Sequence, residues 1–145
     1  MGTIFSAYDI RGRADDSLTT EYVWNVGRAF ADWLPDDGAV AFSFRSDTDL
    51  KILHAFTEGV QLQGRDAINT GEDNQQGLIA LLRDGGAAGG AIVTHDALQG
   101  LEIITLLDAR GVGVTSESGL LEINQLVEAG NFIPAAQKGE LKEAV

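Results

Sequence analysis

Segments with helical spacing of apolar residues alternate with short apolar segments along this chain, and this alternation strongly limits its fold. The pattern predicts helices over residues 19–34, 47–63, 74–83 and 115–129, and strands over residues 40–44, 67–68, 91–94 and 101–107. Strands that alternate with helices form layered α/β domains with a mostly parallel sheet. The short connection between the last two strands indicates one antiparallel pair. We therefore predict a three-layer α/β/α sandwich with a mixed, mostly parallel sheet of about four strands.

Residues that start and stop helices bound the first predicted helix. Thr19 can cap its N-terminus, Glu21 suits the positive end of the helix dipole, and Pro35 stops the helix. Trp24 and Trp33 lie nine positions apart within it, which places them about 180° apart around the helix axis. At least one tryptophan therefore lies away from the main apolar stripe, either in a contact surface or at the edge of the core.

The chain is strongly acidic, with 22 Asp and Glu against 10 Lys and Arg and a net charge of −12. Nucleic acids and anionic membranes attract proteins through Lys and Arg, so we expect neither as a partner. No apolar run in the sequence approaches the length of about 18 residues that a membrane-spanning helix needs. Met1 to Phe5 lack the features of a signal peptide, so we expect a cytoplasmic protein. The lack of cysteine excludes disulfides, thiolate catalysis and Cys-ligated metals.

A collinear series of short motifs runs through the chain. The most specific of them, Ala7-Tyr8-Asp9-Ile10-Arg11-Gly12, stands close to the N-terminus. The others are Leu-Thr-Thr-Glu at 18–21, Gly-Arg-Ala-Phe at 27–30, Gly-Gly-Ala-Ile-Val-Thr at 89–94 and Gln-Lys-Gly-Glu-Leu at 137–141. This series resembles the N-terminal domain, domain I, of the α-D-phosphohexomutases, the phosphomannomutase/phosphoglucomutase family. The resemblance implies a phosphohexomutase domain I-like unit over residues 1–134. It also implies a polar tail over residues 135–145 that resembles the linker to the family's second domain.

The active-site loop of the family, Thr-x-Ser-His-Asn-Pro, is altered in this chain. In the family its serine carries the phosphoryl group that passes to and from the hexose. The corresponding stretch here reads Thr94-His95-Asp96-Ala97-Leu98-Gln99-Gly100, which is shorter and lacks that serine. Glu102 stands where the family has a lysine near the phosphate, and a carboxylate at that place repels the anion. We therefore expect no catalytic residue in the degenerate loop Thr94, His95 and Asp96.

The resemblance also concerns the metal. Family members use Mg²⁺, which is bound by an Asp-Gly-Asp-x-Asp-Arg loop that would follow the end of this chain. Phosphoryl transfer needs a cation to neutralise the developing charge, and the sequence offers no carboxylate trio at a suitable spacing. We therefore expect no metal site, no cofactor and no enzyme activity of the chain on its own. The activity of the family is an intramolecular phosphotransfer, which is an isomerase reaction.

Three residues are candidates for binding a phosphate or another anion, namely Arg11, Thr94 and His95. The guanidinium of Arg11 matches a phosphate group, but Asp9 and Arg11 could instead form internal hydrogen bonds that serve folding. His95 and Asp96 could form a general acid/base pair or half of a metal site. Adjacent residues at the end of a strand usually point apart, so solvent-exposed loop residues are the alternative interpretation of this pair.

Two hypotheses about function remain. In the first, the chain is a catalytically inactive domain, a pseudoenzyme, that acts by binding or assembly. A face covered by a second domain in the family would then be paired, most simply in a homodimer. In the second, the chain binds phosphosugars or has a phosphomannomutase- or phosphoglucomutase-related role in carbohydrate metabolism, with domains supplied by another chain. Titration with hexose phosphates, repeated with Arg11→Ala, distinguishes the two hypotheses.

Overall fold

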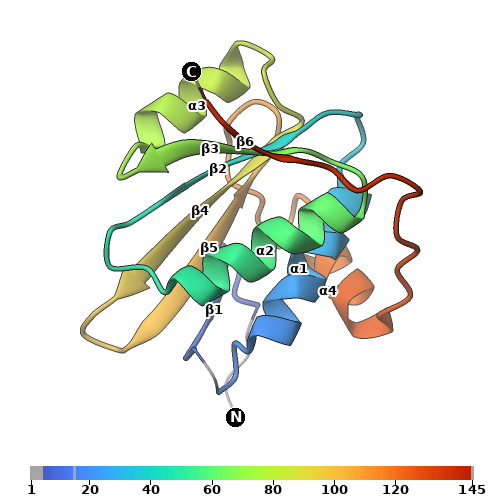
Figure 1. The fold of residues 1–145 in the computed structure, drawn as a ribbon. Coiled ribbons are helices and arrows are strands. Elements are labelled where there is room, and N and C mark those ends of the chain that lie inside the picture. Colours follow the sequence, from blue (N-terminus) through green and yellow to red (C-terminus); the bar gives the residue numbers. More distant parts are fainter. Residues whose placement is uncertain (1–4, 15, 145) are drawn as a thin grey trace.

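The computed structural model of this chain describes residues 5–14 and 16–144 (Figure 1). Met1 to Ile4, Asp15 and Val145 lie outside the described residues, so the expectation about a signal peptide concerns mainly residues outside this range. The elements in chain order are β1 (Ile10–Gly12), α1 (Thr20–Trp33), β2 (Val40–Phe44), α2 (Leu50–Leu62), β3 (Ala67–Glu72), α3 (Gln75–Arg83), β4 (Gly89–Asp96), β5 (Leu101–Leu107), α4 (Leu120–Ala129) and β6 (Leu141–Glu143).

Six strands form one sheet within the described range, in the order β1-β5-β4-β2-β3-β6. β2 runs parallel to β4 and β3, and β6 runs parallel to β3, whereas β5 is antiparallel to both β4 and β1. The prediction of a mixed, mostly parallel sheet is therefore confirmed. The predicted number of about four strands is too low, because β1 and β6 span only 3 residues each. Segments of that length are too short to show the two-residue periodicity of a strand.

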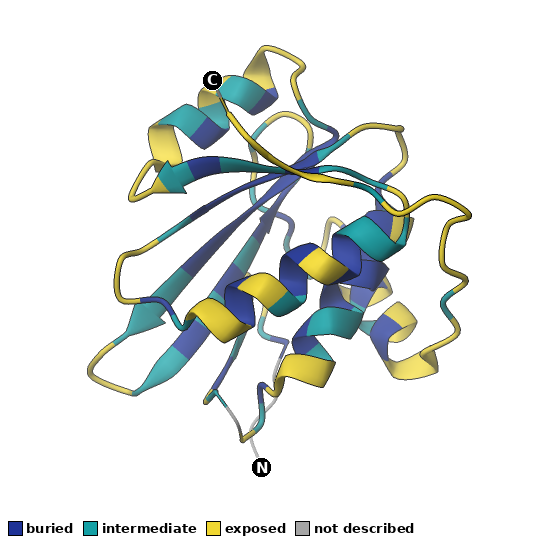
Figure 2. Ribbon diagram, in the orientation of Figure 1, coloured by how far each residue is buried: buried dark blue, intermediate teal, exposed yellow. Residues whose placement is uncertain are grey.

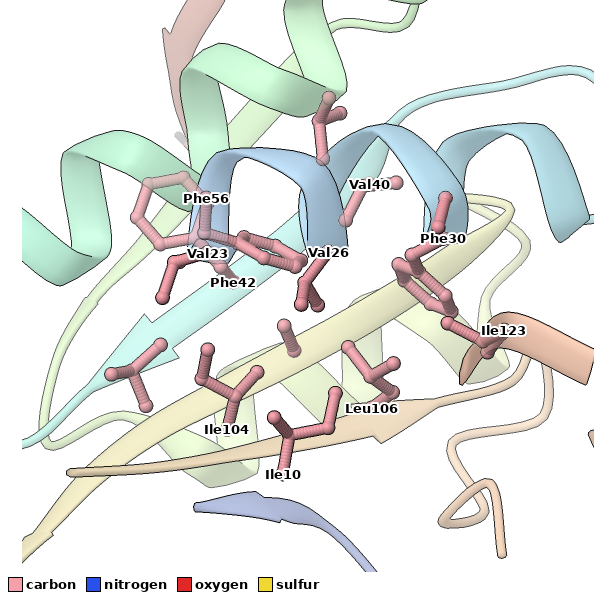
Figure 3. Packing of buried hydrophobic residues seen from close by; sticks show 14 of the residues in the cluster. Ile10, Val23, Val26, Phe30, Val40, Phe42, Phe56, Ile104, Leu106 and Ile123 are labelled. Atoms are coloured by element: carbon pink, nitrogen blue, oxygen red, sulfur yellow. The ribbon is translucent and has the colours of Figure 1, made fainter. Parts of the chain in front are cut away.

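Helices cover both faces of the sheet (Figure 1). The larger core cluster packs α1, α2 and α4 against one face, with Phe30, Ile104 and Ile123 among its members (Figure 3). The smaller cluster packs α3 against the other face and comprises Ala41, Leu78, Leu82, Ile92 and Leu107. In Figure 2 the buried segments of α1 and α2 face the sheet while the exposed segments face outward. The predicted three-layer sandwich is thus confirmed.

The contact between α1 and α2 is very close, and a glycine from each helix makes it possible. A Cβ atom at Gly27 would stand 2.3 Å from the backbone oxygen of Phe56. A Cβ atom at Gly59 would stand 2.2 Å from the backbone oxygen of Trp24. Both distances are far below a van der Waals contact, so no larger residue fits without separating the two helices.

The ends of the helices follow from local hydrogen bonds and backbone conformation. Thr19 Oγ1 accepts a hydrogen bond from the backbone N of Tyr22 at 3.1 Å, so α1 begins where the sequence predicts. α4 begins at Leu120 and not at the predicted residue 115, because Gly119 has a φ of 149°, which is not helical. No helix in the described part of the chain has the length and apolar character needed to cross a membrane.

The two tryptophans of α1 differ in their surroundings. Trp33 packs partly buried against the larger core cluster and stacks on Phe30, with ring centroids 6.2 Å apart. Trp24 lies beside the guanidinium of Arg28, whose central carbon is 4.7 Å from the ring centroid. The interpretation as the edge of the core is therefore correct for Trp33, and Trp24 forms a cation–π contact.

Candidate functional site

A cleft of about 330 Å³ lies at the carboxyl end of β4. It forms where the β4–β5 hairpin meets the start of α2 and the segment after β1. The residues that line it are Arg13, Ala14, Asp16, Asp47, Asp49, His95, Gly100 and Glu102. Ligands of α/β proteins commonly bind at the carboxyl ends of the strands, and the altered stretch 94–100 ends in this cleft. We therefore take it as the candidate functional site.

A second hollow, of about 470 Å³, lies at the opposite end of the sheet around Arg65. The Arg65 guanidinium donates hydrogen bonds to the backbone oxygens of Ala31, Leu34, Asp36 and Gly38 at 2.7 to 3.2 Å. These contacts tie the end of α1 to the loop before β2, so the hollow surrounds a structural arginine.

The contact between His95 and Glu102 is at the centre of the candidate site. These residues are register partners across β4 and β5, so both side chains project from the sheet face that carries α1 and α2. His95 Nδ1 contacts Glu102 Oε2. Glu102 is only 2% exposed, and its Oε1 accepts a hydrogen bond from the backbone N of Asp49 at 2.6 Å. One buried carboxylate thus joins β4, β5 and the N-terminus of α2.

The same contact controls the charge of His95, whose side chain is 28% exposed. The hydrogen bond with Glu102 is the main cause that raises the pKa of His95; burial lowers this pKa and comes next in size, and the charges of Glu102, Asp47 and Asp96 raise it further. His95 therefore keeps its proton to a higher pH than an ordinary histidine and neutralises the buried carboxylate of Glu102.

β4 extends beyond its predicted end and runs to Asp96. The interpretation of His95 as an exposed loop residue is wrong, because the residue lies within the β4–β5 pairing and its ring is held by Glu102. Asp96 Oδ1 accepts hydrogen bonds from the backbone N of Leu98 at 3.0 Å and of Gln99 at 3.2 Å, which shapes the turn. His95 and Asp96 are adjacent on a strand and project from opposite faces, so they do not act as a pair.

Arg11 is held by a carboxylate from the segment just before β1. Its Nε and Nη2 donate hydrogen bonds to the two carboxylate oxygens of Asp9 at 2.9 and 2.7 Å. Ser6 Oγ donates to Asp9 Oδ1 at 2.8 Å. Burial raises the pKa of Asp9, but the hydrogen bonds from Arg11 and Ser6 outweigh it, so that this pKa lies below its usual value. The internal contact suggested by the sequence is present, and anion binding by Arg11 stays a prediction.

The sheet register separates the three residues predicted to bind an anion. Arg11 of β1 and Thr94 of β4 both pair with Ile103 of β5, so they lie in one row on one face of the sheet. His95 belongs to the neighbouring row, with Glu102, and projects from the opposite face. The side chains of Arg11, Thr94 and His95 therefore do not converge on a single ligand.

Sequence reasoning missed most of the charged residues that line the cleft. The missed residues are Arg13, Asp16, Asp47 and Asp49. Sequence reasoning also did not show that Glu102 is buried. The contact of His95 with Glu102 had a usable signal, since the short turn between β4 and β5 fixes the register that pairs them. Within residues 5–14 and 16–144, no group of three His, Asp or Glu side chains could hold a metal ion.

Sequence comparison finds phosphomannomutases. No family model matches the chain. A phosphomannomutase of Salmonella typhimurium is 29% identical over 145 residues, which cover 97% of this chain and 32% of that protein. A phosphomannomutase of Klebsiella pneumoniae is 26% identical, over 97% of this chain and 92% of that protein. The chain thus spans about a third of the length of the Salmonella relative.

Structural comparison finds the same fold. A phosphoglucomutase/phosphomannomutase family protein from Burkholderia thailandensis aligns with a TM-score of 0.76 and 21% identity, over 97% of this chain and 32% of that one. A putative phosphomannomutase from Thermus thermophilus aligns with a TM-score of 0.74 and 20% identity, over 99% of this chain and 34% of that one. Over almost its whole length, the chain is thus similar in sequence to phosphomannomutases and shares the fold of about a third of the phosphoglucomutase/phosphomannomutase structures that it matches.

Proposed function

We propose that this domain does not carry a phosphoryl group and acts by binding or assembly. The observation that supports this is the end of the β4–β5 hairpin. The turn over residues 97–100 contains no hydroxyl side chain, and His95 and Glu102 occupy the paired strand positions on either side of it. A phosphoryl carrier presents a nucleophilic atom beside cations that neutralise the phosphate.

The charges of the cleft support the same proposal. Its ionisable lining consists of the carboxylates of Asp16, Asp47, Asp49 and Glu102 and the cations Arg13 and His95. Two like charges about 4 Å apart repel each other by about 4 kcal/mol at an effective dielectric constant near 20. A phosphate dianion in this cleft would meet more carboxylates than cations, so we expect it to bind poorly.

A domain exchange tests the proposal. Because this chain matches only a third of the Salmonella relative, the exchange supplies the remaining two thirds from that protein. The chain replaces the matching segment of the Salmonella typhimurium phosphomannomutase, and the interconversion of mannose 1-phosphate and mannose 6-phosphate is measured with Mg²⁺ present. We expect a folded chimera, judged by near-ultraviolet circular dichroism, that does not convert the substrate, whereas the unmodified Salmonella protein does. Turnover by the chimera would contradict the proposal.

Binding of phosphosugars is the second candidate function, and the cations that line the cleft favour it. They are Arg13 and His95, with Arg11 on the other face of the sheet as a further anion-binding candidate. Calorimetric titration with glucose 1-phosphate, mannose 1-phosphate and inorganic phosphate measures this binding, and Arg11→Ala and Arg13→Ala locate it. Heat that is lost in one of these variants would support the candidate. Absence of heat and of amide shifts would remove it.

Assembly into a homodimer is the simplest form of the first function, because symmetric pairs of one chain are the commonest oligomers. Among the described residues, the most accessible large apolar side chains are Leu98, 99% exposed in the turn between β4 and β5, and Ile133, 85% exposed in the segment after α4. Light scattering at micromolar concentration measures the mass in solution. A mass of two chains is the expected result, and a mass of one chain would contradict the dimer while leaving binding to another partner as the function.

A further inference from the structure

We propose that His95 and Glu102 form a proton-controlled clamp that fastens the end of the β4–β5 hairpin to the N-terminus of α2 and so sets how open the cleft is. The clamp is inferred from contacts within the chain, and it does not depend on the function proposed above or on the identity of a ligand.

The contacts that close the clamp converge on the carboxylate of Glu102. Its Oε1 accepts a hydrogen bond from the backbone N of Asp49 at 2.6 Å, at the positive end of the α2 dipole. Its Oε2 contacts Nδ1 of His95 on the neighbouring strand. A carboxylate that is only 2% exposed depends on such partners, because removing a charge from water is costly unless the charge is compensated.

The segment before α2 is anchored independently of this carboxylate. The backbone N of Arg45 and the Oγ1 of Thr48 both donate hydrogen bonds to the backbone oxygen of Val93, each at 3.0 Å. Thr48 is itself buried. When the contact to Glu102 weakens, we therefore expect the hairpin end beyond Val93 to move, and the start of α2 to stay in place.

Charged groups from every element around the cleft surround His95. They are Asp96 on its own strand, Glu102 on β5, Asp47 and Asp49 before α2, and Arg13 and Asp16 after β1. Carboxylates dominate this set, so a proton on His95 neutralises part of a negative cluster. When the proton leaves His95, this neutralisation is lost, and the contact that holds the two strands to α2 weakens.

The direction of the response to pH follows from the raised pKa of His95. In the open state the ring has the pKa of an ordinary histidine, about 6.5. A group whose pKa is raised in the closed state stabilises that state fully below the ordinary pKa. This stabilisation is lost as pH rises through the raised pKa. The clamp is therefore closed in mildly acidic solution and opens toward alkaline pH. Linkage to one proton changes this opening equilibrium by at most about tenfold per pH unit.

Nuclear magnetic resonance on the full chain tests the clamp. The ring signals of His95 give its titration midpoint, and hydrogen exchange of the Asp49 amide, corrected for intrinsic exchange, gives the opening equilibrium at each pH. We expect the protection of the Asp49 amide to fall several-fold through the same pH range in which His95 loses its proton. Constant protection would overturn the proposal, and so would an equal fall at amides of α3, since that fall would report unfolding of the whole domain.

Variants identify the groups that are responsible. His95→Gln removes the charge and should make the protection of the Asp49 amide independent of pH. Glu102→Gln should lower the His95 midpoint toward that of an ordinary histidine. His54→Gln is the matched control, because His54 is exposed on α2 and should leave both readings unchanged. A pH response that survives in His95→Gln, or a His95 midpoint that Glu102→Gln leaves in place, would contradict the clamp. The titration midpoint of His95 in Glu102→Gln keeps the proposal testable if His95→Gln does not fold.

Discussion

The contact between α1 and α2 and the end of the β4–β5 hairpin are built on different physical principles. The helix contact is apolar and depends on shape, because Gly27 and Gly59 let two backbones approach at distances that no side chain tolerates. The hairpin end depends on charge, because the buried carboxylate of Glu102 is compensated by His95 and by the backbone N of Asp49. The first region should therefore respond to volume and hardly to pH, and the second should respond to protonation.

The largest effect is expected at the helix contact. Gly59→Ala places a Cβ atom 2.2 Å from the backbone oxygen of Trp24, so α1 and α2 must separate. The gain of about 1 kcal/mol in helix propensity does not offset this. We expect the free energy of unfolding to fall by about 3 kcal/mol, measured by urea denaturation.

Gly113→Ala is the control for this substitution, because an added Cβ there would have no atom within 4 Å apart from its own residue and its two neighbours in the chain. It should change the free energy of unfolding by less than about 0.5 kcal/mol. If Gly59→Ala is as stable as Gly113→Ala, the close contact of the two helices is not a determinant of the fold.

A smaller effect is expected at the hairpin end. Glu102→Gln removes the charge that accepts hydrogen bonds from His95 and Asp49, and it should lower the free energy of unfolding by about 2 kcal/mol at pH 6. Glu58→Gln is the matched control, since Glu58 is exposed on α2. Equal stability of the two variants would show that the buried carboxylate does not hold the hairpin end in place.

The smallest effects are the pH responses of single groups. The pKa of His95 is raised, so its contribution to stability is complete below about pH 6.5 and is lost as pH rises through the raised value. The pKa of Asp9 is lowered, so its contribution is present above about pH 3.9 and is lost as pH falls through the lowered value. Unfolding free energies across pH should therefore lose an alkaline step in His95→Gln and an acidic step in Asp9→Asn. An alkaline step that persists in His95→Gln, or an acidic step that persists in Asp9→Asn, would contradict these assignments.

The regions also differ in how well the sequence predicts them. α1 shows a long helical period and a clear cap at Thr19, so its type and its start could be predicted. The start of α4 could not, because it depends on the backbone conformation of Gly119. β1 and β6 are three-residue strands that exist only through pairing with β5 and β3.

The candidate site could be predicted only in part. The motif around Arg11 and the altered stretch 94–100 identify the right end of the sheet. The contact of His95 with Glu102 depends on the β4–β5 register, and predicting the end of β4 too early conceals it. The acidic lining depends on loops that meet only in three dimensions, such as the segments that contain Asp16 and Asp47.

The proposed function requires that the end of β4 does not carry a phosphoryl group. Incubation of the chain with glucose 1,6-bisphosphate and Mg²⁺, followed by peptide mass spectrometry under conditions that preserve acid-labile phosphoryl groups, tests this claim. The Salmonella typhimurium phosphomannomutase treated in the same way is the positive control. We predict no phosphoryl group on residues 94–102 of this chain. A phosphorylated Thr94 or His95 whose label is lost on addition of a hexose phosphate would contradict it.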